Sequence, residues 1–181
     1  MAAVAKTALR CHHRQVRRAA MLHVQEAMAR VALQTLPELV PVGQRLGLYW
    51  PIGAEPDLRA LAEARPCALP VVEGAQLLYR PWQIGEPLVT DACGIPAPAA
   101  GPALEPAALA ALLVPALALD ARGIRLGSGG GWYDRLRANP AWGAVPALAV
   151  LPSACLTEEL PSDPWDVPFD GWLDERGLHW I

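Results

Sequence analysis

Glycine, arginine and aspartate residues gather in one short stretch, residues 125–135, where together they could bind phosphate. Four glycines, at positions 127 and 129–131, follow Arg125 and precede Asp134 and Arg135. Glycine allows positive φ angles and close approach of the backbone, so several N–H groups can point at one anion. Guanidinium groups match phosphate oxygens, and a carboxylate suits the Mg²⁺ that accompanies nucleotide phosphates. The stretch therefore predicts a phosphate site with a metal ligand at Asp134.

A flexible surface loop is the alternative, because glycine runs are common in loops. The neighbouring Arg125, Tyr133 and Asp134 favour the phosphate site. Two standard motifs do not apply here. The stretch lacks the Lys-Ser/Thr ending of a P-loop, and its glycine spacing does not fit a dinucleotide fingerprint.

Regular elements on both sides should hold this stretch in place. The apolar run 110–114, closed by Pro115, is typical of a buried strand, and a turn is expected at 120–123. Residues 132–138 contain no glycine or proline, so a helix should begin at Trp132 with its positive end beside the glycines. The order of strand, glycines and helix places the phosphate site at a strand end.

Strands and helices alternate along the rest of the chain, which predicts one α/β domain over residues 1–181 with a largely parallel sheet. A helix is expected over 2–34, and strands over 45–50, 68–72, 77–80 and 147–151, with a closing hairpin at 172–180. A further helix is expected over 56–63. Glu55 would then lie at a strand-to-helix junction, where it either meets a ligand or caps that helix electrostatically.

The first predicted helix carries four cations on one face. Lys6, Arg10, Arg14 and Arg17 are spaced by four, four and three residues. Two interpretations follow from the residues themselves. The face is either a solvated basic surface or part of an arginine-rich transit peptide.

Composition and charge exclude several classes of protein. A net charge of −3 argues against a nucleic-acid-binding surface. No apolar run approaches the ~18 residues of a membrane span, and no secretory signal is visible. The four cysteines are widely spaced, and neither they nor the four histidines form a metal-binding pattern. A reduced, cytoplasmic protein is therefore expected.

The stretch VPALALDARGIRLGSGGGWYDRL, residues 114–136, resembles the signature of the 5-formyltetrahydrofolate cyclo-ligases, also called methenyltetrahydrofolate synthetases. That signature runs roughly Val-Pro-Gly-x-x-Phe-Asp, then Gly-x-Arg-Leu-Gly-x-Gly-x-Gly-Tyr-Tyr-Asp. Weaker likenesses extend over most of the chain, including Lys6-x-x-x-Arg10 and Gly94-Ile-Pro-Ala-Pro98. The resemblance implies a three-layer α/β/α fold, similar to the ribose-phosphate-isomerase and CoA-transferase folds.

The resemblance also implies an ATP-dependent enzyme with Mg²⁺ as its metal. Such an enzyme cyclises 5-formyltetrahydrofolate to 5,10-methenyltetrahydrofolate and releases ADP and phosphate. It favours a third interpretation of the basic helix face, in which its first cations reach the nucleotide phosphates and Arg17 matters less. The residues that it assigns to ATP are Lys6, Arg10, Arg125, Gly127, Ser128, Gly129, Gly130, Gly131, Trp132 and Tyr133.

The remaining assignments follow from the same resemblance. Arg125 and Tyr133 are expected to be catalytic, and Asp134 and Asp166 to hold the metal. A small-molecule folate is the expected partner of a monomer that binds neither nucleic acid nor membrane. The residues assigned to the folate are Trp50, Glu55, Ser128 and Trp132.

Four departures from the family pattern keep other functions open. Leu119 replaces a phenylalanine, Trp132 the first aromatic of the Tyr-Tyr pair, and Trp165 a histidine or asparagine. The glutamine that usually follows the late strand is missing from residues 151–156. The departures support a competing hypothesis, a nucleotide- or folate-binding relative without turnover. A phosphosugar-binding protein of the same fold is the third candidate.

Overall fold

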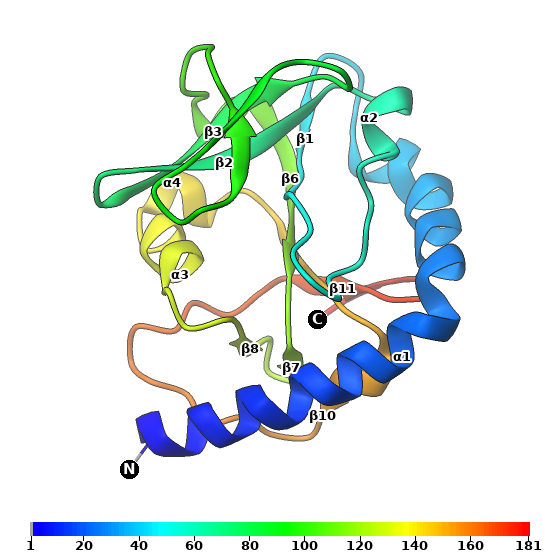
Figure 1. Ribbon diagram of the computed structural model, residues 1–181, viewed down its shortest axis with the longest axis vertical. Coiled ribbons are helices and arrows are strands. Elements are labelled where there is room, and N and C mark those ends of the chain that lie inside the picture. The colour runs from blue at the N-terminus through cyan, green and yellow to red at the C-terminus, as the bar shows by residue number, and fades with distance from the viewer. Residues whose placement is uncertain (1) are drawn as a thin grey trace.

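A seven-stranded sheet forms the centre of the computed structural model, which describes residues 2–181, with side chains from residue 6 onward (Figure 1). The five inner strands pair in parallel and the two outer strands pair antiparallel, which confirms the largely parallel sheet. Across the sheet the strands are β12 (Leu178–Trp180), β11 (Gly171–Leu173), β9 (Ala147–Val150), β6 (Leu109–Pro115), β1 (Arg45–Gly47), β2 (Cys67–Glu73) and β3 (Gln76–Trp82).

Helices cover both faces of this sheet. One face packs against α1 (Ala2–Leu39) and α2 (Leu61–Ala64), and the other against α3 (Trp132–Arg137) and α4 (Pro140–Gly143). Strand β6 shows why both faces are covered. Neighbouring residues of a strand point to opposite faces, and β6 is apolar on both. Leu113 packs in the same apolar cluster as Met28 of α1, whereas Leu112 and Val114 pack in the cluster that contains Leu136 of α3. The layers are therefore helix, sheet and helix.

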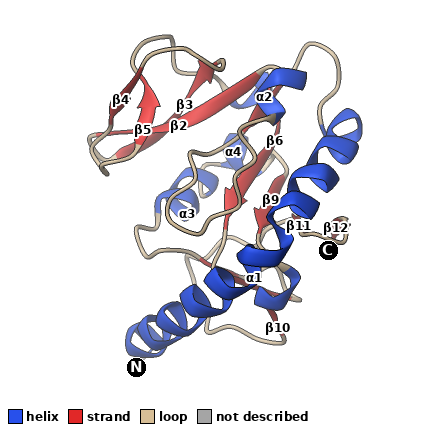
Figure 2. Cartoon of the chain, turned by 45° about the vertical axis from the view of Figure 1, so that its right-hand side comes forward, coloured by secondary structure: helices blue, strands red, loops and turns tan. Residues whose placement is uncertain are grey.

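Smaller elements carry the chain around the ends of the sheet (Figure 2). A second sheet contains β10 (Leu156–Thr157), β7 (Ala118–Asp120) and β8 (Arg125–Leu126), and a third pairs β4 (Leu88–Thr90) with β5 (Pro96–Pro98). Two 3₁₀ turns, η1 (Pro106–Ala108) and η2 (Ser153–Cys155), precede β6 and β10. The predicted turn is confirmed, since the Gly123 N–H donates to the Asp120 carbonyl at 3.0 Å. Strand β8 then leads through residues 127–131 into α3.

The helix predicted over residues 56–63 is wrong in its first half, because α2 begins only at Leu61. The Asp57 carboxylate accepts a hydrogen bond from the Arg59 N–H at 3.1 Å. The Gln25 side chain of α1 bonds the N–H of Asp57 at 3.0 Å and its carbonyl at 2.8 Å. Backbone groups bonded in this way do not enter a helical ladder. Residues 51–60 therefore form a loop attached to α1.

The packing of Gly123 supplies a test of the fold. Its φ is +77°, and a Cβ there would lie 2.5 Å from the Phe169 carbonyl oxygen. Gly123→Ala should lower the free energy of unfolding by about 2–4 kcal/mol, through backbone strain and overpacking. Gly74→Ala is the matched control, because Gly74 has φ +56° but no atom within 4 Å of a Cβ.

The control should lose about 1 kcal/mol, the cost of the left-handed conformation by itself. Urea denaturation of the two variants beside the unmodified protein measures both losses. Equal losses would contradict the close packing of Gly123 against Phe169.

Candidate active site

A pocket of about 150 Å³ opens where the ends of β1 and β6 meet the glycine loop, defined here as residues 127–131. The carboxyl ends of parallel strands are the edge at which α/β sheets bind ligands. Predicted site residues that lie outside the pocket lining are Lys6, Arg10, Gly127, Asp134 and Asp166. Those that line it are Trp50, Glu55, Arg125, Ser128, Gly129, Gly130, Gly131, Trp132 and Tyr133.

All four glycines of the loop have a structural reason. Gly129 and Gly131 have positive φ angles of 109° and 63°. The other two, Gly127 and Gly130, do not have positive φ angles, but there is no space for a side chain at either position. A Cβ at 127 would lie 2.5 Å from Nη1 of Arg125, and one at 130 would lie 2.7 Å from Cδ1 of Trp132. The loop backbone therefore carries no side chain at these four positions.

Arg125 is a cation with an incomplete set of partners. Its Nη1 donates to the Pro115 carbonyl at 3.1 Å, and its Cζ lies 5.3 Å from the centre of the Tyr133 ring. Its Nε is buried without a hydrogen-bond partner among the side chains described. Burial lowers the pKa of Arg125, and the charge of Asp134 opposes that effect. A guanidinium held in this way favours an anionic ligand in the pocket.

Glu55 faces Arg17 across the loop that follows β1. Its Oε2 accepts a hydrogen bond from the Ile52 N–H at 3.0 Å, and its Oε1 lies 3.7 Å from Nη1 of Arg17. Burial raises the pKa of Glu55, although the Ile52 N–H and the charge of Arg17 act against it. Since α2 begins only at Leu61, the interpretation of Glu55 as a helix cap is wrong.

Arg17 makes more buried contacts than the sequence analysis expected. It is 7% exposed, and its Nη1 also donates to the Ala116 carbonyl at 3.1 Å, beside the end of β6. It is the ion-pair partner of Glu55. The signal for this position was the helical spacing that continues from Arg10 through Arg14.

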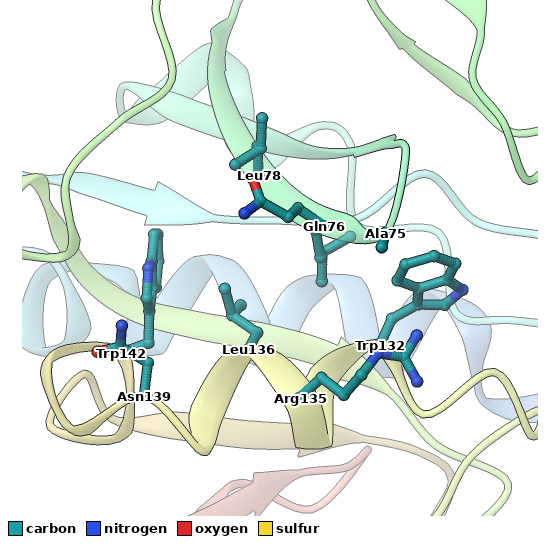
Figure 3. A pocket seen from close by; sticks show the side chains of 9 residues that line it. Ala75, Gln76, Leu78, Trp132, Arg135, Leu136, Asn139 and Trp142 are labelled. Carbon is teal, nitrogen blue, oxygen red and sulfur yellow. The ribbon is translucent and has the colours of Figure 1, made fainter.

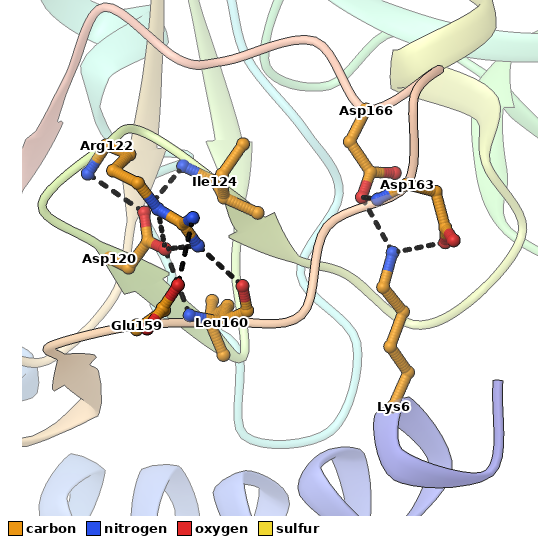
Figure 4. A network of polar contacts seen from close by, with 8 residues as sticks. All are labelled: Lys6, Asp120, Arg122, Ile124, Glu159, Leu160, Asp163 and Asp166. Carbon is orange, nitrogen blue, oxygen red and sulfur yellow. Dashed lines mark hydrogen bonds and ion pairs between the residues drawn. The ribbon is translucent and has the colours of Figure 1, made fainter. Parts of the chain in front are cut away.

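The first turns of α1 reach the glycine loop and the C-terminal segment. Arg10 Nε donates to the Gly127 carbonyl at 3.1 Å. Lys6 Nζ donates to Asp163 and to Asp166, each at 2.7 Å (Figure 4). Burial lowers the pKa of Lys6, but the hydrogen bonds from these two carboxylates outweigh it, and the pKa lies above its ordinary value.

Asp163 is a residue that the sequence reasoning missed. It lies three positions before Asp166, and the acid- and proline-rich sequence of residues 163–170 was the available signal. Its N–H also donates to the Asp166 carboxylate at 2.8 Å, so the two aspartates and Lys6 form one cluster. The predicted metal ligand Asp166 is thus already paired with a predicted phosphate-binding cation.

The remaining predicted residues have ordinary aromatic or helical surroundings. The Trp50 ring lies 4.4 Å from the Arg59 guanidinium carbon and packs edge-on against Trp82. Burial raises the pKa of Tyr133 to about 12. Asp134 lies in the first turn of α3. Among the residues from 6 onward, no group of three histidine, cysteine, aspartate or glutamate side chains could hold a metal by itself.

Comparison with known proteins decides the family. The model of the 5-formyltetrahydrofolate cyclo-ligase family matches residues 2–174. The chain belongs to this family. A 5-formyltetrahydrofolate cyclo-ligase from Mycolicibacterium smegmatis is 33% identical over 96% of this chain and 95% of the relative. The enzyme of that name from Escherichia coli is 39% identical over 57 residues, about a third of either chain.

Solved structures of two similar proteins share the fold. The NMR structure of Aquifex aeolicus 5,10-methenyltetrahydrofolate synthetase has a TM-score of 0.72 at 28% identity, covering 97% of this chain and 92% of that one. The Mycoplasma pneumoniae synthetase also has a TM-score of 0.72, at 20% identity over 94% of this chain and 98% of that one, which shows the fold alone. Within residues 2–181, no helix is long and apolar enough to cross a membrane.

The raised pKa of Glu55 predicts a pH dependence of stability. A carboxyl whose pKa is raised by folding contributes most stability below its ordinary pKa of 4.5, and this contribution is lost as pH rises through the folded value. Glu55→Gln removes the titration. The unfolding free energy of the unmodified protein minus that of Glu55→Gln should therefore fall as pH rises from about 4.5.

Urea denaturation at a series of pH values measures this difference. Glu63→Gln is the control, because Glu63 lies on α2 outside the pocket lining. A difference that rises with pH would show that the charge of Arg17 outweighs the burial of Glu55.

Proposed function

We propose that this protein catalyses the ATP-dependent cyclisation of 5-formyltetrahydrofolate to 5,10-methenyltetrahydrofolate, with release of ADP and phosphate. One observation carries the proposal beyond family membership. A single pocket contains Trp50 and Glu55, expected at the folate, together with Arg125 and the glycine loop, expected at the phosphates. Such a pocket can bring a formyl oxygen and a phosphoryl donor together.

The reaction needs help because the oxygen of a formamide is a poor leaving group. In the proposed sequence the formyl oxygen attacks the γ-phosphorus of ATP, an O–P bond forms, and the bond to ADP breaks. The second folate nitrogen, N10, then attacks the formyl carbon. The proton of N10 passes to the departing phosphate, which leaves with the former formyl oxygen, and the ring is closed. Catalysis of this kind depends on positioning and on neutralising phosphate charge.

The side chains of the pocket suit these two tasks. Arg125 supplies a partly buried positive charge beside the loop backbone, where charge on a transferring phosphoryl group would gather. Glu55 can accept hydrogen bonds from the amino and ring N–H groups of a pterin, and the Trp50 indole can pack against its plane. Arg10, already bonded to the loop at Gly127, and Lys6 would add charge from α1.

The carboxylates of Asp134 and Asp166 fit Mg²⁺, which proteins usually bind with one or two carboxylates plus substrate phosphates. When bound, the ion would neutralise charge on the nucleotide phosphates. The Lys6 ammonium lies 2.7 Å from the Asp166 carboxylate. It would therefore have to share that oxygen with the metal ion or move away from it. We also infer one domain, a monomer and a cytoplasmic location, the last supported by four cysteines that are free thiols.

The first prediction of this proposal is turnover itself. Protein, MgATP and 5-formyltetrahydrofolate, when mixed, should produce the absorbance of the methenyl product. Omitting ATP should abolish this absorbance, because no phosphoryl donor is left. Removing divalent ions with EDTA should also abolish it, because the phosphate charge would no longer be neutralised. Turnover in EDTA would contradict the metal assignment.

The competing relative without turnover would behave differently. It would bind both ligands in calorimetric titrations and form no methenyl product. Binding of neither ATP nor the folate at millimolar concentration, about −4 kcal/mol, would refute the cyclo-ligase proposal.

A second prediction tests the glycine loop. Gly130→Val places a branched side chain where even a Cβ would lie 2.7 Å from Cδ1 of the Trp132 ring. The ring or the loop must move, so ATP binding and cyclisation should fall together by about ten-fold or more. The folate should keep part of its affinity through Trp50 and Glu55.

Glu55→Gln is the matched variant with the opposite pattern. It should weaken the folate and leave ATP binding nearly unchanged, because Glu55 is assigned to the folate. Calorimetry with each ligand gives the affinities, and circular dichroism checks folding. Equal loss of both ligands in both variants would contradict the division of the pocket.

A further inference from the structure

The ring of Phe169 contacts two guanidinium groups, just outside the pocket of the active site. Its centre lies 5.2 Å from Cζ of Arg125 and 4.8 Å from Cζ of Arg137. Both distances are within the roughly 6 Å at which an aromatic ring attracts a cation. Phe169 is 3% exposed and does not line the pocket, whereas Arg125 does. The ring therefore supports a pocket residue from outside the pocket.

The orientation of the Arg125 guanidinium depends on such packing. Among the described residues it has one hydrogen bond, from Nη1 to the Pro115 carbonyl at 3.1 Å, and its Nε has no partner. The Tyr133 ring lies 5.3 Å from its Cζ, and a Cβ on Gly127 would lie 2.5 Å from its Nη1. One hydrogen bond at one end does not fix a long side chain, so the two rings and the loop backbone hold it in place.

Arg137 in turn fixes the position of Phe169. It is 4% exposed, and its guanidinium donates to the Pro168 carbonyl at 2.6 Å and to the Asp170 carboxylate at 2.9 Å. These two partners directly precede and follow Phe169 in the chain. Asp170 is also bonded to Ala147 at the start of β9, through its N–H at 3.0 Å and its carboxylate at 2.8 Å. The chain around Phe169 is therefore attached to α3 and to the central sheet.

Helix α3 directs Arg137 toward this segment. Trp132 and Leu136 lie on the side of α3 that faces β3, with Leu78 opposite them (Figure 3). Successive residues of an α-helix lie about 100° apart around its axis, so the residue after Leu136 points away from that side. Arg137 can thus bond residues 167–170 while its neighbours on the helix pack toward the sheet.

We propose that Phe169 is a positioning residue for the reaction. Its ring holds the Arg125 guanidinium at the pocket, and Arg137 holds the chain that carries the ring. The inference rests on the proposed function, because it takes Arg125 to neutralise charge on the transferring phosphoryl group. A misplacement of about 1 Å is enough to impair such a charge. Phe169 thus affects the rate without touching either ligand.

The alternative is a core residue with no part in the reaction. Phe169 belongs to the apolar cluster that also contains Leu119 and Leu136, so its loss would lower stability in either case. The two interpretations differ in what happens to Arg125. A purely structural Phe169 affects folding alone, whereas a positioning residue changes the hold on the guanidinium and the rate constant of the folded enzyme.

The experiment removes the ring and keeps most of the buried apolar volume, in Phe169→Leu and in Phe169→Met. Two such variants are used so that the test remains if one of them folds poorly. Leu109→Val is the matched control, because Leu109 lies in the same apolar cluster but at the other end of β6 from Pro115. Circular dichroism and urea denaturation show which variants fold. Kinetics of methenyl formation give kcat and KM.

Loss of the ring should lower kcat about ten-fold or more and leave the KM for 5-formyltetrahydrofolate nearly unchanged, because Arg125 acts on charge that gathers during phosphoryl transfer. Arg137→Lys keeps a charge but not the forked hydrogen bonds, so it should lower kcat by a smaller factor. Leu109→Val should change neither constant. An equal loss of kcat in Leu109→Val, or none in the two Phe169 variants, would overturn the inference.

A double variant tests whether Phe169 acts through Arg125. The guanidinium is already absent from Arg125→Lys, so adding Phe169→Leu should lower kcat by less than about two-fold. A loss as large as the one that Phe169→Leu causes by itself would show that the ring acts in another way, which contradicts the proposal.

A further measurement does not depend on turnover. The Nε–H of Arg125 is buried, so its proton should exchange slowly with water. Its NMR signal is assigned by its absence from Arg125→Lys. Exchange should become about ten-fold faster or more in Phe169→Leu and stay unchanged in Leu109→Val. Unchanged exchange in Phe169→Leu would overturn the inference. Absence of methenyl product from the unmodified protein would count against the cyclo-ligase proposal, while the exchange rates would still show whether Phe169 holds Arg125.

Discussion

The buried carboxylate of Asp120 is the interaction on which the site depends. It is 2% exposed and accepts hydrogen bonds from the N–H groups of Arg122, Ile124 and Leu160, and from the Arg122 guanidinium (Figure 4). Burial raises the pKa of Asp120, but these hydrogen bonds outweigh it and hold the pKa below its ordinary value. One charge thus joins the β7–β8 turn to a segment forty residues later. That segment leads directly to Asp163.

Further contacts hold the C-terminal segment beside the β7–β8 turn and α3. The Phe169 N–H donates to the Gly123 carbonyl at 2.8 Å, which continues the attachment begun at Asp120. Arg137 of α3 donates to the Pro168 carbonyl at 2.6 Å and to Asp170 at 2.9 Å. The C-terminal segment is therefore bonded both before and after its Asp163–Asp166 cluster. Lys6 of α1 therefore pairs with two aspartates whose positions are fixed by contacts on both sides of them in the chain.

The sequence predicted those features that depend on neighbouring residues. The apolar run of β6, the turn at Gly123 and the start of α3 at Trp132 are set by local patterns, and the structure confirms them. The partners of Lys6 could not be predicted, because Asp163 lies 157 residues away and only the folded chain brings the two together. The late start of α2 has the same cause. Gln25 of α1, which is distant in the sequence, bonds the backbone of Asp57 in the segment before α2. Local sequence patterns were sufficient to identify the pocket residues. The ion pairs that these residues form could be identified only from the tertiary structure.

Helix α1 joins core and site in one continuous helix of 38 residues, which curves around the molecule (Figure 1). Leu36 near its far end is 2% exposed in the core beneath the sheet, while Arg10 touches the glycine loop. At 1.5 Å per residue these positions lie about 39 Å apart along the curved axis, so a small change in the direction of the helix at Leu36 moves Arg10 by a larger distance. A displacement of about 1 Å is enough to impair a positioned charge. The packing of Leu36 in the core therefore helps to determine where Arg10 lies at the other end of the helix.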